Sequence, residues 1–455
     1  MAGTVGSLMP TAWDLLAELV AFRSVADPLV FPKSECDAAA QWVARAMRED
    51  GFVDVAVLDT PDGRSSVYGY LPATHAAASA PTVLLYAHYD VQPPLDESAW
   101  LTPPFELTER DGRWYARGAA DCKGAIVMHL LALRTLKAHG GVPVNVKLIV
   151  EGSEEQASGG LEQYAEAHPE LLAADAILIG DAGNFRVGVP TVTASLRGIS
   201  MLRIQVDTLA RDVHSGQFGG AAPDALHALI KILASLTAQD GSTGVDGLPA
   251  EMAWDGLAYT DEQFRADAGV LDGVDLIGSG KVADRLWARP SLTVMGIDCP
   301  PVTGATPSVH ATARALVGLR MPPGQDQATV GKLLREHVER HTPWNVRLTV
   351  EDAAHGQPFR ANTDTPAYAA MADAMRAGYP GSEMQVAGQG GGIPLCNTLA
   401  TLYPDAEILL IGLNEPEALI HGLNESVSAE ELERMTLTEA HFLLNYARMR
   451  AAAKA

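Results

Sequence analysis

The stretch TVLLYAHYD, residues 82–90, decides the fold of this chain. Residues 82–87 are apolar, aromatic or β-branched and predict a short buried strand. His88 and Asp90 follow at its end, so both side chains lie on one face of the extended chain. Standing alone, such a pair is more often structural than functional. Its role therefore depends on what the fold brings beside it.

Short apolar segments alternate with helical patterns through the first half of the chain. This alternation predicts an α/β domain with a mostly parallel central sheet covered by helices. In such sheets ligands bind at the carboxyl ends of the strands, which is where residues 88–90 lie. The predicted helices span residues 13–22, 37–47, 124–139 and 161–172, and the predicted strands span residues 82–87, 144–150 and 176–180.

The pattern changes near Pro190, and the βα alternation returns after Gly356. A chain of 455 residues exceeds one ordinary domain. We therefore expect one α/β domain, residues 1–190 and 355–455, interrupted by a smaller α+β domain at residues 191–354. The inserted part is predicted to contain strands at 191–208, 311–320 and 345–350, helices at 221–238 and 328–341, and a loop-rich acidic segment at 241–281; a last helix is predicted at 429–447.

Composition excludes several classes of partner. The net charge is −23, and a surface of that sign repels nucleic acids and anionic membranes, so we expect neither as a partner. No apolar run approaches the roughly 20 residues of a membrane span, and we expect no signal peptide in residues 1–10. The four cysteines have no paired spacing, which predicts reduced thiols and a cytoplasmic protein.

Two further segments place carboxylates at the ends of predicted elements. Asp121, in RGAADCKG (residues 117–124), precedes a helix and could bridge two cations or simply cap that helix. Cys122 beside it could be a thiolate, but no histidine-containing cysteine motif supports that role. Glu154 and Glu155 follow the strand at 144–150, and in extended backbone they point in different directions. One could bind metal while the other takes a proton from water, although a solvated acidic turn would look the same.

Asp181 closes the apolar strand at 176–180, and His421 lies in HGLNE, residues 421–425. Each segment has an ordinary structural interpretation when taken alone. Taken together, they supply two histidines, three carboxylates and a spare glutamate to one domain. That donor set predicts a metal site that suits zinc and also accepts cobalt or manganese.

In this order the motifs resemble those of the carnosinase and carboxypeptidase G2 family of co-catalytic zinc peptidases (peptidase family M20). The resemblance covers nearly the whole chain. It departs from the family pattern at Ala116, where glycine is usual, and at Cys122, where an acidic residue is usual. Neither is a ligand position. Asp181, where other branches have glutamate, favours the carnosinase-like dipeptidase branch.

The resemblance implies a role for each residue of the cluster. His88 and Asp181 would bind one zinc, Glu155 and His421 would bind a second, and Asp121 would bridge the two. Glu154 matches the general base, and Asp90 matches the residue that orients His88.

The resemblance also implies that the inserted domain is a lid that forms a homodimer. His214, in DVHSGQFGG (residues 212–220), would reach the active site of the partner subunit and stabilise an oxyanion. Arg320 matches the arginine that binds a substrate carboxylate. Gly392, in GGGIP (residues 390–394), and Gly304, in GATP (residues 304–307), stand where relatives have hydroxyl side chains near that carboxylate. Their loss predicts more space and a bulkier or modified substrate.

We therefore expect hydrolysis of a small amide or peptide bond in a dipeptide or dipeptide-like compound. Deacylation of N-acyl amino acids, desuccinylation and amide formation use the same machinery and remain alternatives. A non-catalytic metal-binding scaffold would be expected to lack the base or some of the ligands, and none is missing here.

Overall fold

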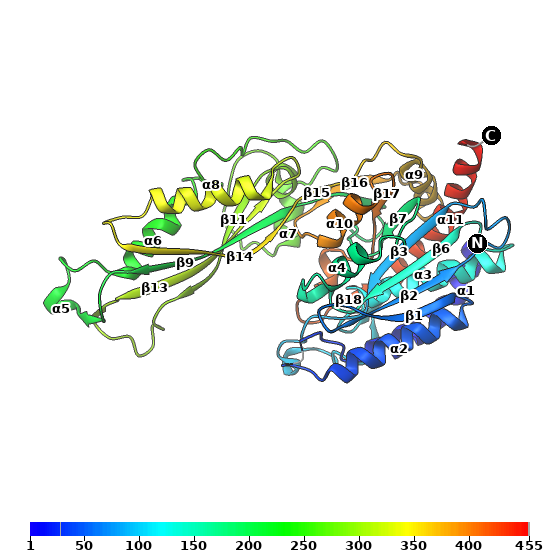
Figure 1. The fold of residues 1–455 in the computed structure, drawn as a ribbon, viewed down its shortest axis with the longest axis horizontal. Coiled ribbons are helices and arrows are strands. Elements are labelled where there is room, and N and C mark those ends of the chain that lie inside the picture. The colour runs from blue at the N-terminus through cyan, green and yellow to red at the C-terminus, as the bar shows by residue number, and fades with distance from the viewer. Residues whose placement is uncertain (28, 454–455) are drawn as a thin grey trace. The chain divides into compact units, whose positions relative to one another are not determined.

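The computed structural model describes residues 1–27 and 29–453, and the chain divides into two compact units (Figure 1). The first unit comprises residues 1–194, 361–387 and 394 onward, and the second comprises residues 195–360 and 388–393. The expected ranges differ at three stretches: they assign residues 191–194 to the inserted domain, and residues 355–360 and 388–393 to the larger one. Residues 388–393 pack on the inserted unit, where Arg197 N–H donates to the carbonyl oxygen of Gln389 at 3.2 Å.

Most of the first unit's strands belong to a nine-stranded sheet in the order β1-β2-β6-β3-β7-β17-β8-β15, with β16 beside β8; β15 and the last residues of β8 and β16 fall in the ranges of the second unit. The strands are β1 (Val53–Asp59), β2 (Ser65–Leu71), β3 (Thr82–His88), β6 (Asn145–Glu151), β7 (Ala176–Ile179), β8 (Thr191–Leu196), β15 (Phe359–Arg360), β16 (Gln385–Gln389) and β17 (Glu407–Leu410). A separate three-stranded sheet holds β4 (Thr108–Arg110), β5 (Arg113–Tyr115) and β18 (Ser426–Ser428).

The α/β class is as predicted, but the sheet is mixed and not mostly parallel. Strands β6, β3, β7 and β17 are parallel to one another. Strands β1 and β2 form a hairpin that joins β6 in antiparallel orientation, and β8 runs antiparallel to β17. The hairpin was not predicted from the sequence, because its first strand is half exposed and lacks a continuous apolar run. Antiparallel strands need only a tight turn between them, so no crossover helix marks their presence.

The helices of the first unit are α1 (Ala2–Val20), α2 (Lys33–Glu49), α3 (Lys123–Ala138), α4 (Gly160–Ala167), α9 (Pro366–Gly378), α10 (Pro394–Leu402) and α11 (Ala429–Ala453). Helix α3 packs on β3 and also contacts α1 and α11. Its side chains are buried on nearly every face, which explains why its sequence is apolar throughout. Helix α2 covers β1 and β2. Short 3-10 turns lie at Glu97–Ala99, Glu154–Gln156 and Pro416–Ala418.

The second unit is an antiparallel four-stranded sheet in the order β11-β13-β9-β14, with α6 (Ala225–Ser235) and α8 (Gln327–Arg340) packed against it. Its strands are β9 (Gly198–Asp207), β11 (Ser291–Asp298), β13 (Thr312–Met321) and β14 (Arg347–Gly356). The core lies between sheet and helices and includes Leu202, Ile204, Leu229, Val317 and Leu334. Smaller elements are β10 (Val213–His214), β12 (Ser308–Val309), α5 (Ser215–Phe218), α7 (Asp261–Asp267) and a π-helical turn at Asp284–Ala288.

This arrangement of the first unit sets up a site at one edge of its sheet. Strand β3 lies between β6 and β7, and all three run in the same direction. Their carboxyl ends therefore meet at one edge, where ligands bind in sheets of this kind. None of the described helices is long and apolar enough to cross a membrane.

Candidate metal centre

Five predicted ligands meet at that edge of the sheet in the first unit. His88 is the last residue of β3, and Asp181 follows β7 by two residues. Asp121 lies just before α3, and Glu155 lies in the turn after β6. His421 comes from the loop that precedes β18, more than two hundred residues further along the chain.

Asp121 is the centre of the cluster, and each of its carboxylate oxygens faces a different histidine. Oδ1 lies 3.1 Å from Nε2 of His88, and Oδ2 lies 3.0 Å from Nε2 of His421. The Asp121 side chain does not cap α3, which has no side-chain cap. Its two oxygens are therefore directed at two different places, as a bridging ligand requires.

The carboxylates of Asp181 and Glu155 each lie beside one of these two histidines. Asp181 Oδ1 lies 3.3 Å from His88 Nε2, and Glu155 Oε2 lies 3.2 Å from His421 Nε2. The pairing is therefore His88 with Asp181 and His421 with Glu155, with Asp121 between them.

Asp90 connects His88 to the two glutamates. The other ring nitrogen of His88, Nδ1, lies 3.5 Å from Asp90 Oδ1 and 3.0 Å from the Asp90 carbonyl oxygen. The same carboxylate accepts the backbone N–H groups of Glu154 at 3.2 Å and Glu155 at 3.1 Å. One buried side chain thus fixes the ring of a ligand and the turn that carries Glu154.

The expectation that Glu154 and Glu155 lie in extended backbone is wrong, because they form a 3-10 turn. The turn forms because Asp90 accepts both N–H groups, which an extended strand would direct to its neighbours. The Glu155 carboxylate accepts a hydrogen bond from the Gln92 side chain at 2.8 Å and faces His421. Burial, together with the charge of Asp181, raises the pKa of Glu154 well above its usual value.

Glu425 and Arg117 lie inside the motifs of His421 and Asp121, but no role was predicted for either residue. The carboxylate of Glu425 accepts the backbone N–H groups of Gly118, Ala120 and Asp121 at 3.0 to 3.1 Å, and Arg117 Nη1 donates to it at 2.7 Å. Arg117 Nη2 also donates to the carbonyl oxygen of Gly422 at 2.9 Å. This buried pair therefore joins the loop of Asp121 to the loop of His421. Two charged residues beside the ligand positions were the only sequence signal.

Each histidine carries a raised pKa in this arrangement. Burial alone would lower the pKa of His88, but the charge of Asp181 and the hydrogen bonds to the carboxylates raise it well above its usual value. Hydrogen bonds with Asp121 and Glu155 raise the pKa of His421 to about 10. Burial raises the pKa of Asp181 to about 6, although His88 opposes that shift.

The donor set fits a pair of divalent cations. Three carboxylates and an imidazole lie together with little exposure to water; the His88, Asp121, Asp181 and Glu155 side chains are at most 8% exposed. Buried like charges at this density need compensating positive charge. The ligand atoms lie 3.0 to 3.3 Å apart, close to the roughly 3.3 Å between neighbouring ligands of a tetrahedral zinc with bonds of about 2.0 Å. Imidazole and carboxylate suit zinc, cobalt and manganese.

Cys122 lies near His88 and Asp181 but behaves as a buried thiol. Burial, with the charge of Asp181, raises its pKa well above the usual value, and its Sγ lies 3.5 Å from the carbonyl oxygen of Gly180. Since metal ligation and nucleophilic attack require the thiolate, the protein environment disfavours both.

The four remaining predicted residues belong to the inserted unit. His214 is exposed on β10, and the next residue donates its N–H to the carbonyl oxygen of Pro307 at 2.8 Å, so the loop of Gly304 lies beside it. Gly304 has a φ of +86° and open space around its Cα. Arg320 is on β13, and a Cβ at Gly392 would lie 3.2 Å from the carbonyl oxygen of Arg197. Gly304 thus leaves space, whereas Gly392 leaves little.

A second histidine cluster in the inserted unit is already satisfied by protein partners. His337 Nδ1 accepts the N–H of Asp246 at 3.0 Å, and Arg340 donates to the Asp246 carboxylate at 2.7 Å. His341 also lies 3.0 Å from that carboxylate. The side-chain atoms of this cluster that could bind a metal are therefore already hydrogen-bonded within the protein.

Comparison with known proteins agrees with this geometry. Residues 84–445 match the model of peptidase family M20/M25/M40. A cysteinylglycine-S-conjugate dipeptidase of Corynebacterium striatum is 42% identical over 445 residues, which is 97% of each chain. A human β-Ala-His dipeptidase is 28% identical over 434 residues, 90% of this chain and 84% of that one. The crystal structure of human carnosine dipeptidase 1 superposes with a TM-score of 0.84 at 25% identity, covering 98% of both chains.

The fold and its buried cluster of histidines and carboxylates define a metal-dependent hydrolase. The chain belongs to peptidase family M20/M25/M40, and its relatives include the carnosinase-like dipeptidases predicted from Asp181.

Proposed function

We propose that this protein hydrolyses the peptide bond of a dipeptide at a site that holds two zinc ions. The observation that carries the proposal is the placement of Asp121, whose two oxygens face the two histidines at 3.0 and 3.1 Å. His88 and Asp181 would hold one ion and His421 and Glu155 the other. When bound, such a pair of ions polarises the scissile carbonyl and lowers the pKa of water.

Glu154 acts as the general base and then as the general acid. Its carboxylate takes a proton from the attacking water while the water oxygen bonds to the carbonyl carbon. It then returns that proton to the departing amino group as the C–N bond breaks. Burial raises the pKa of Glu154 above its usual value, which favours proton uptake by its carboxylate and supports this role. Asp90 holds the turn in which Glu154 lies.

We propose an S-substituted cysteinylglycine as the substrate. Two considerations support it: the 42% identity to a dipeptidase named for such conjugates, and the open space beside Gly304. The test compares S-benzyl-cysteinylglycine with alanylglycine and β-alanylhistidine by product analysis. We expect the S-benzyl compound to have the largest kcat/KM. Equal or faster hydrolysis of the simple dipeptides would contradict this assignment.

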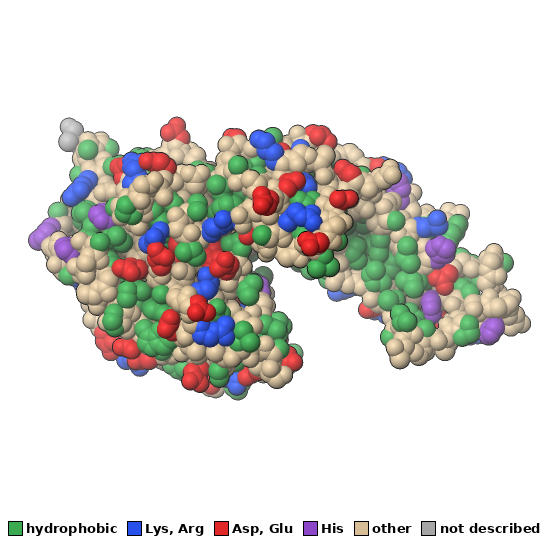
Figure 2. All heavy atoms as spheres, turned by 180° about the vertical axis from the view of Figure 1, so that it is seen from behind, with side chains coloured by type: hydrophobic (Ala, Val, Ile, Leu, Met, Phe, Trp, Pro, Cys, Tyr) green, Lys and Arg blue, Asp and Glu red, His purple; other side chains and the backbone are tan. Residues whose placement is uncertain are grey.

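We also propose a homodimer formed through the inserted unit, in which His214 donates to the oxyanion in the active site of the partner. Exposed apolar side chains on the edge strand β11 support the dimer: Val294, Met295 and Ile297 are 40%, 51% and 41% exposed. Figure 2 shows hydrophobic side chains gathered on one face of the inserted unit. The free thiols of Cys36, Cys122, Cys299 and Cys396 support the expected cytoplasmic location.

Glu154→Gln tests the assignment of the base. The substitution keeps the shape of the side chain and removes its ability to accept a proton. We expect kcat to fall by roughly a factor of 100 to 10,000 while metal content, measured by mass spectrometry, stays at two per chain. Activity within a few-fold of wild type would show that Glu154 is not the base. A parallel loss of metal would show that it is a ligand.

A further inference from the structure

Gln92 contacts Glu155 from the segment that follows β3, and its amide group holds that residue at two points. Its Nε2 donates to the Glu155 carboxylate oxygen Oε2 at 2.8 Å and to the Glu155 carbonyl oxygen at 3.4 Å. Both of these oxygens are acceptors, so the amide nitrogen of Gln92, which carries two N–H donors, must face them. One NH2 group therefore joins the backbone and the carboxylate of the same residue.

The oxygen that Gln92 contacts is the one that faces His421. Glu155 Oε2 lies 3.2 Å from His421 Nε2, and the Glu155 N–H donates to the carboxylate of Asp90 at 3.1 Å. Glu155 has one more rotatable bond than Asp181, the carboxylate of the other pair, so more side-chain freedom is lost when its oxygen is held in place. The hydrogen bonds at its N–H, its carbonyl oxygen and its carboxylate remove that freedom before any metal binds.

The two pairs of predicted ligands also differ in how far the surrounding protein encloses them. The side chains of His88 and Asp181 are 0% and 7% exposed, whereas the His421 side chain is 53% exposed. Close packing restrains the first pair, but a half-exposed imidazole has water on one side. In the described part of the chain, both hydrogen bonds of the Gln92 side chain are made to the second pair. Gln92 therefore supports the pair that burial restrains less.

We infer that Gln92 is a positioning residue for Glu155, and that it sets the affinity for the second metal ion without affecting the affinity for the first. This inference rests on the proposed two-metal site and concerns only the pair of His421 and Glu155. Removing the hydrogen-bond partner of a metal ligand weakens metal binding by about 10- to 100-fold. Asp90 contacts His88 Nδ1 as well as the Glu155 N–H, so its loss would affect both pairs. Gln92 is the residue through which the second pair is changed alone.

Gln92→Met tests this role, because methionine has a similar length and lacks the amide N–H groups. We expect titration of the wild type with zinc against a chelating dye to give two ions per chain. Gln92→Met should weaken binding of one ion by about 10- to 100-fold and leave the other within about threefold. Zinc-edge anomalous diffraction from crystals equilibrated with a low zinc concentration should show a weaker peak beside His421 and an unchanged peak beside His88.

Gln156→Met is the matched control for the titration. Gln156 is the next residue after Glu155, its side chain is exposed, and within residues 1–27 and 29–453 that side chain forms no hydrogen bond. Its replacement should therefore leave both zinc affinities unchanged.

The metal-free protein distinguishes positioning from a purely structural role. A ligand that binds only the folded state raises its Tm by an amount that grows with the affinity. The Tm of metal-free Gln92→Met should equal that of the metal-free wild type, and the rise in Tm on adding zinc should be smaller in the variant. An equal loss of Tm with and without zinc would show a structural role and overturn the inference.

Unchanged zinc affinity in Gln92→Met, or an equal loss for both ions, would also overturn the inference. Gln92→Ala gives the same comparison if Gln92→Met does not fold. None of these measurements depends on turnover, so the inference and the proposed function can fail separately. If the wild type binds two zinc ions but hydrolyses no dipeptide, the proposed hydrolysis fails, and a selective loss of one affinity in Gln92→Met still supports the role of Gln92.

Discussion

The position of Asp121 depends on a residue that touches no predicted ligand side chain. Glu425 is fully buried, and its carboxylate accepts hydrogen bonds from three backbone N–H groups of the Asp121 loop and from the guanidinium of Arg117. Without it, the loop that directs the two oxygens of Asp121 would lose its common acceptor. The orientation of a metal ligand is therefore set by a carboxylate about three hundred positions away in the chain.

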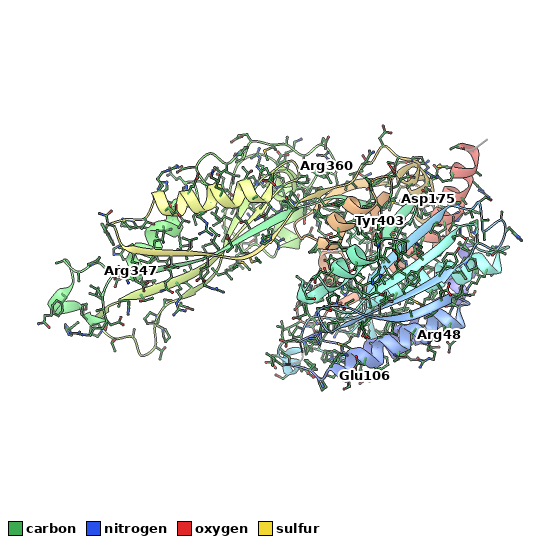
Figure 3. All side chains as sticks on the ribbon, viewed as in Figure 1. Arg48, Glu106, Asp175, Arg347, Arg360 and Tyr403 are labelled. Carbon is green, nitrogen blue, oxygen red and sulfur yellow. The ribbon has the colours of Figure 1, made fainter. Side chains whose placement is uncertain are left out.

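Glu425→Gln should weaken metal binding although it replaces none of the proposed metal ligands. The amide supplies one acceptor oxygen in place of two and removes the negative charge that faces Arg117, so the Asp121 loop is less firmly held. We expect zinc affinity, measured by competition with a chelating dye, to fall about 10- to 100-fold. Glu106→Gln is the control, because Glu106 is exposed (Figure 3) and its side chain has no described hydrogen bond. Unchanged affinity in Glu425→Gln would contradict the role.

The sequence predicted the proposed metal ligands better than the residues that hold those ligands in position. His88, Asp121, Glu155, Asp181 and His421 were recognised because each closes a predicted element or matches a family motif. The role of Glu425 depends on contact between segments far apart in the chain, which no local pattern records. The turn at Glu154 was missed for the same reason, since Asp90 imposes it from another strand.

Strand β3 carries His88, and a buried pair between two helices supports it from behind. His129 of α3 lies 2.8 Å from Glu439 of α11 through Nδ1 and 3.1 Å from the carbonyl oxygen of Tyr86 through Nε2. Donating to both at once requires the protonated ring. Burial alone would lower the pKa of His129, but the charge of Glu439 and the two hydrogen bonds raise it above its usual value.

The pair should stabilise the fold most at low pH. The pKa of His129 in the folded state exceeds the unfolded value of about 6.5. At a pH between these two pKa values, the folded state therefore binds more protons than the unfolded state. The stabilisation is complete below about pH 6.5 and is lost as pH rises through the folded pKa, by up to about 1.4 kcal/mol per pH unit. The reference is the double variant His129→Gln/Glu439→Gln, which does not titrate. Urea unfolding of metal-free protein should show the wild-type advantage shrinking from pH 6 to pH 9; a constant or growing advantage would contradict it.

Elements with a strong periodicity were predicted closely, and the exceptions have physical causes. Strand β3 and helices α3 and α8 begin and end within a residue or two of the predicted positions. The hairpin of β1 and β2 was missed because one of its strands lacks an apolar run. The sheet was therefore expected to be mostly parallel, although only its four central strands are.

The inserted unit was predicted from a change in the sequence pattern. The sequence indicated an insertion, because the βα alternation stops near Pro190 and resumes after Gly356. It did not indicate that residues 388–393 pack with that unit, since this depends on their contact with Arg197. The proposed dimer gives the unit a catalytic role, because His214 would complete the partner's site.

Mixed dimers test this role directly. A chain carrying Glu154→Gln keeps His214, and a chain carrying His214→Ala keeps Glu154. If His214 acts in the partner's site, a mixed dimer has one complete site although each parent dimer has none. Co-expression in equal amounts should therefore restore about a quarter of wild-type activity, measured at equal protein concentration. Activity no higher than that of the parents would contradict action in trans.

The same proposal predicts the mass in solution. Sedimentation should give a dimer of 96.2 kDa, twice the chain mass of 48.1 kDa. Replacing Met295 and Ile297 with glutamate places charge on the exposed edge of β11 and should yield monomers that fold but turn over slowly. A wild-type monomer with full activity would contradict the dimer.

Zinc-edge anomalous diffraction from crystals of the zinc-loaded protein would determine whether Asp121 bridges two metal ions. We expect two anomalous peaks per chain, one beside each oxygen of Asp121, the first near His88 and Asp181 and the second near His421 and Glu155. A single peak, or two peaks that do not share Asp121, would contradict this expectation.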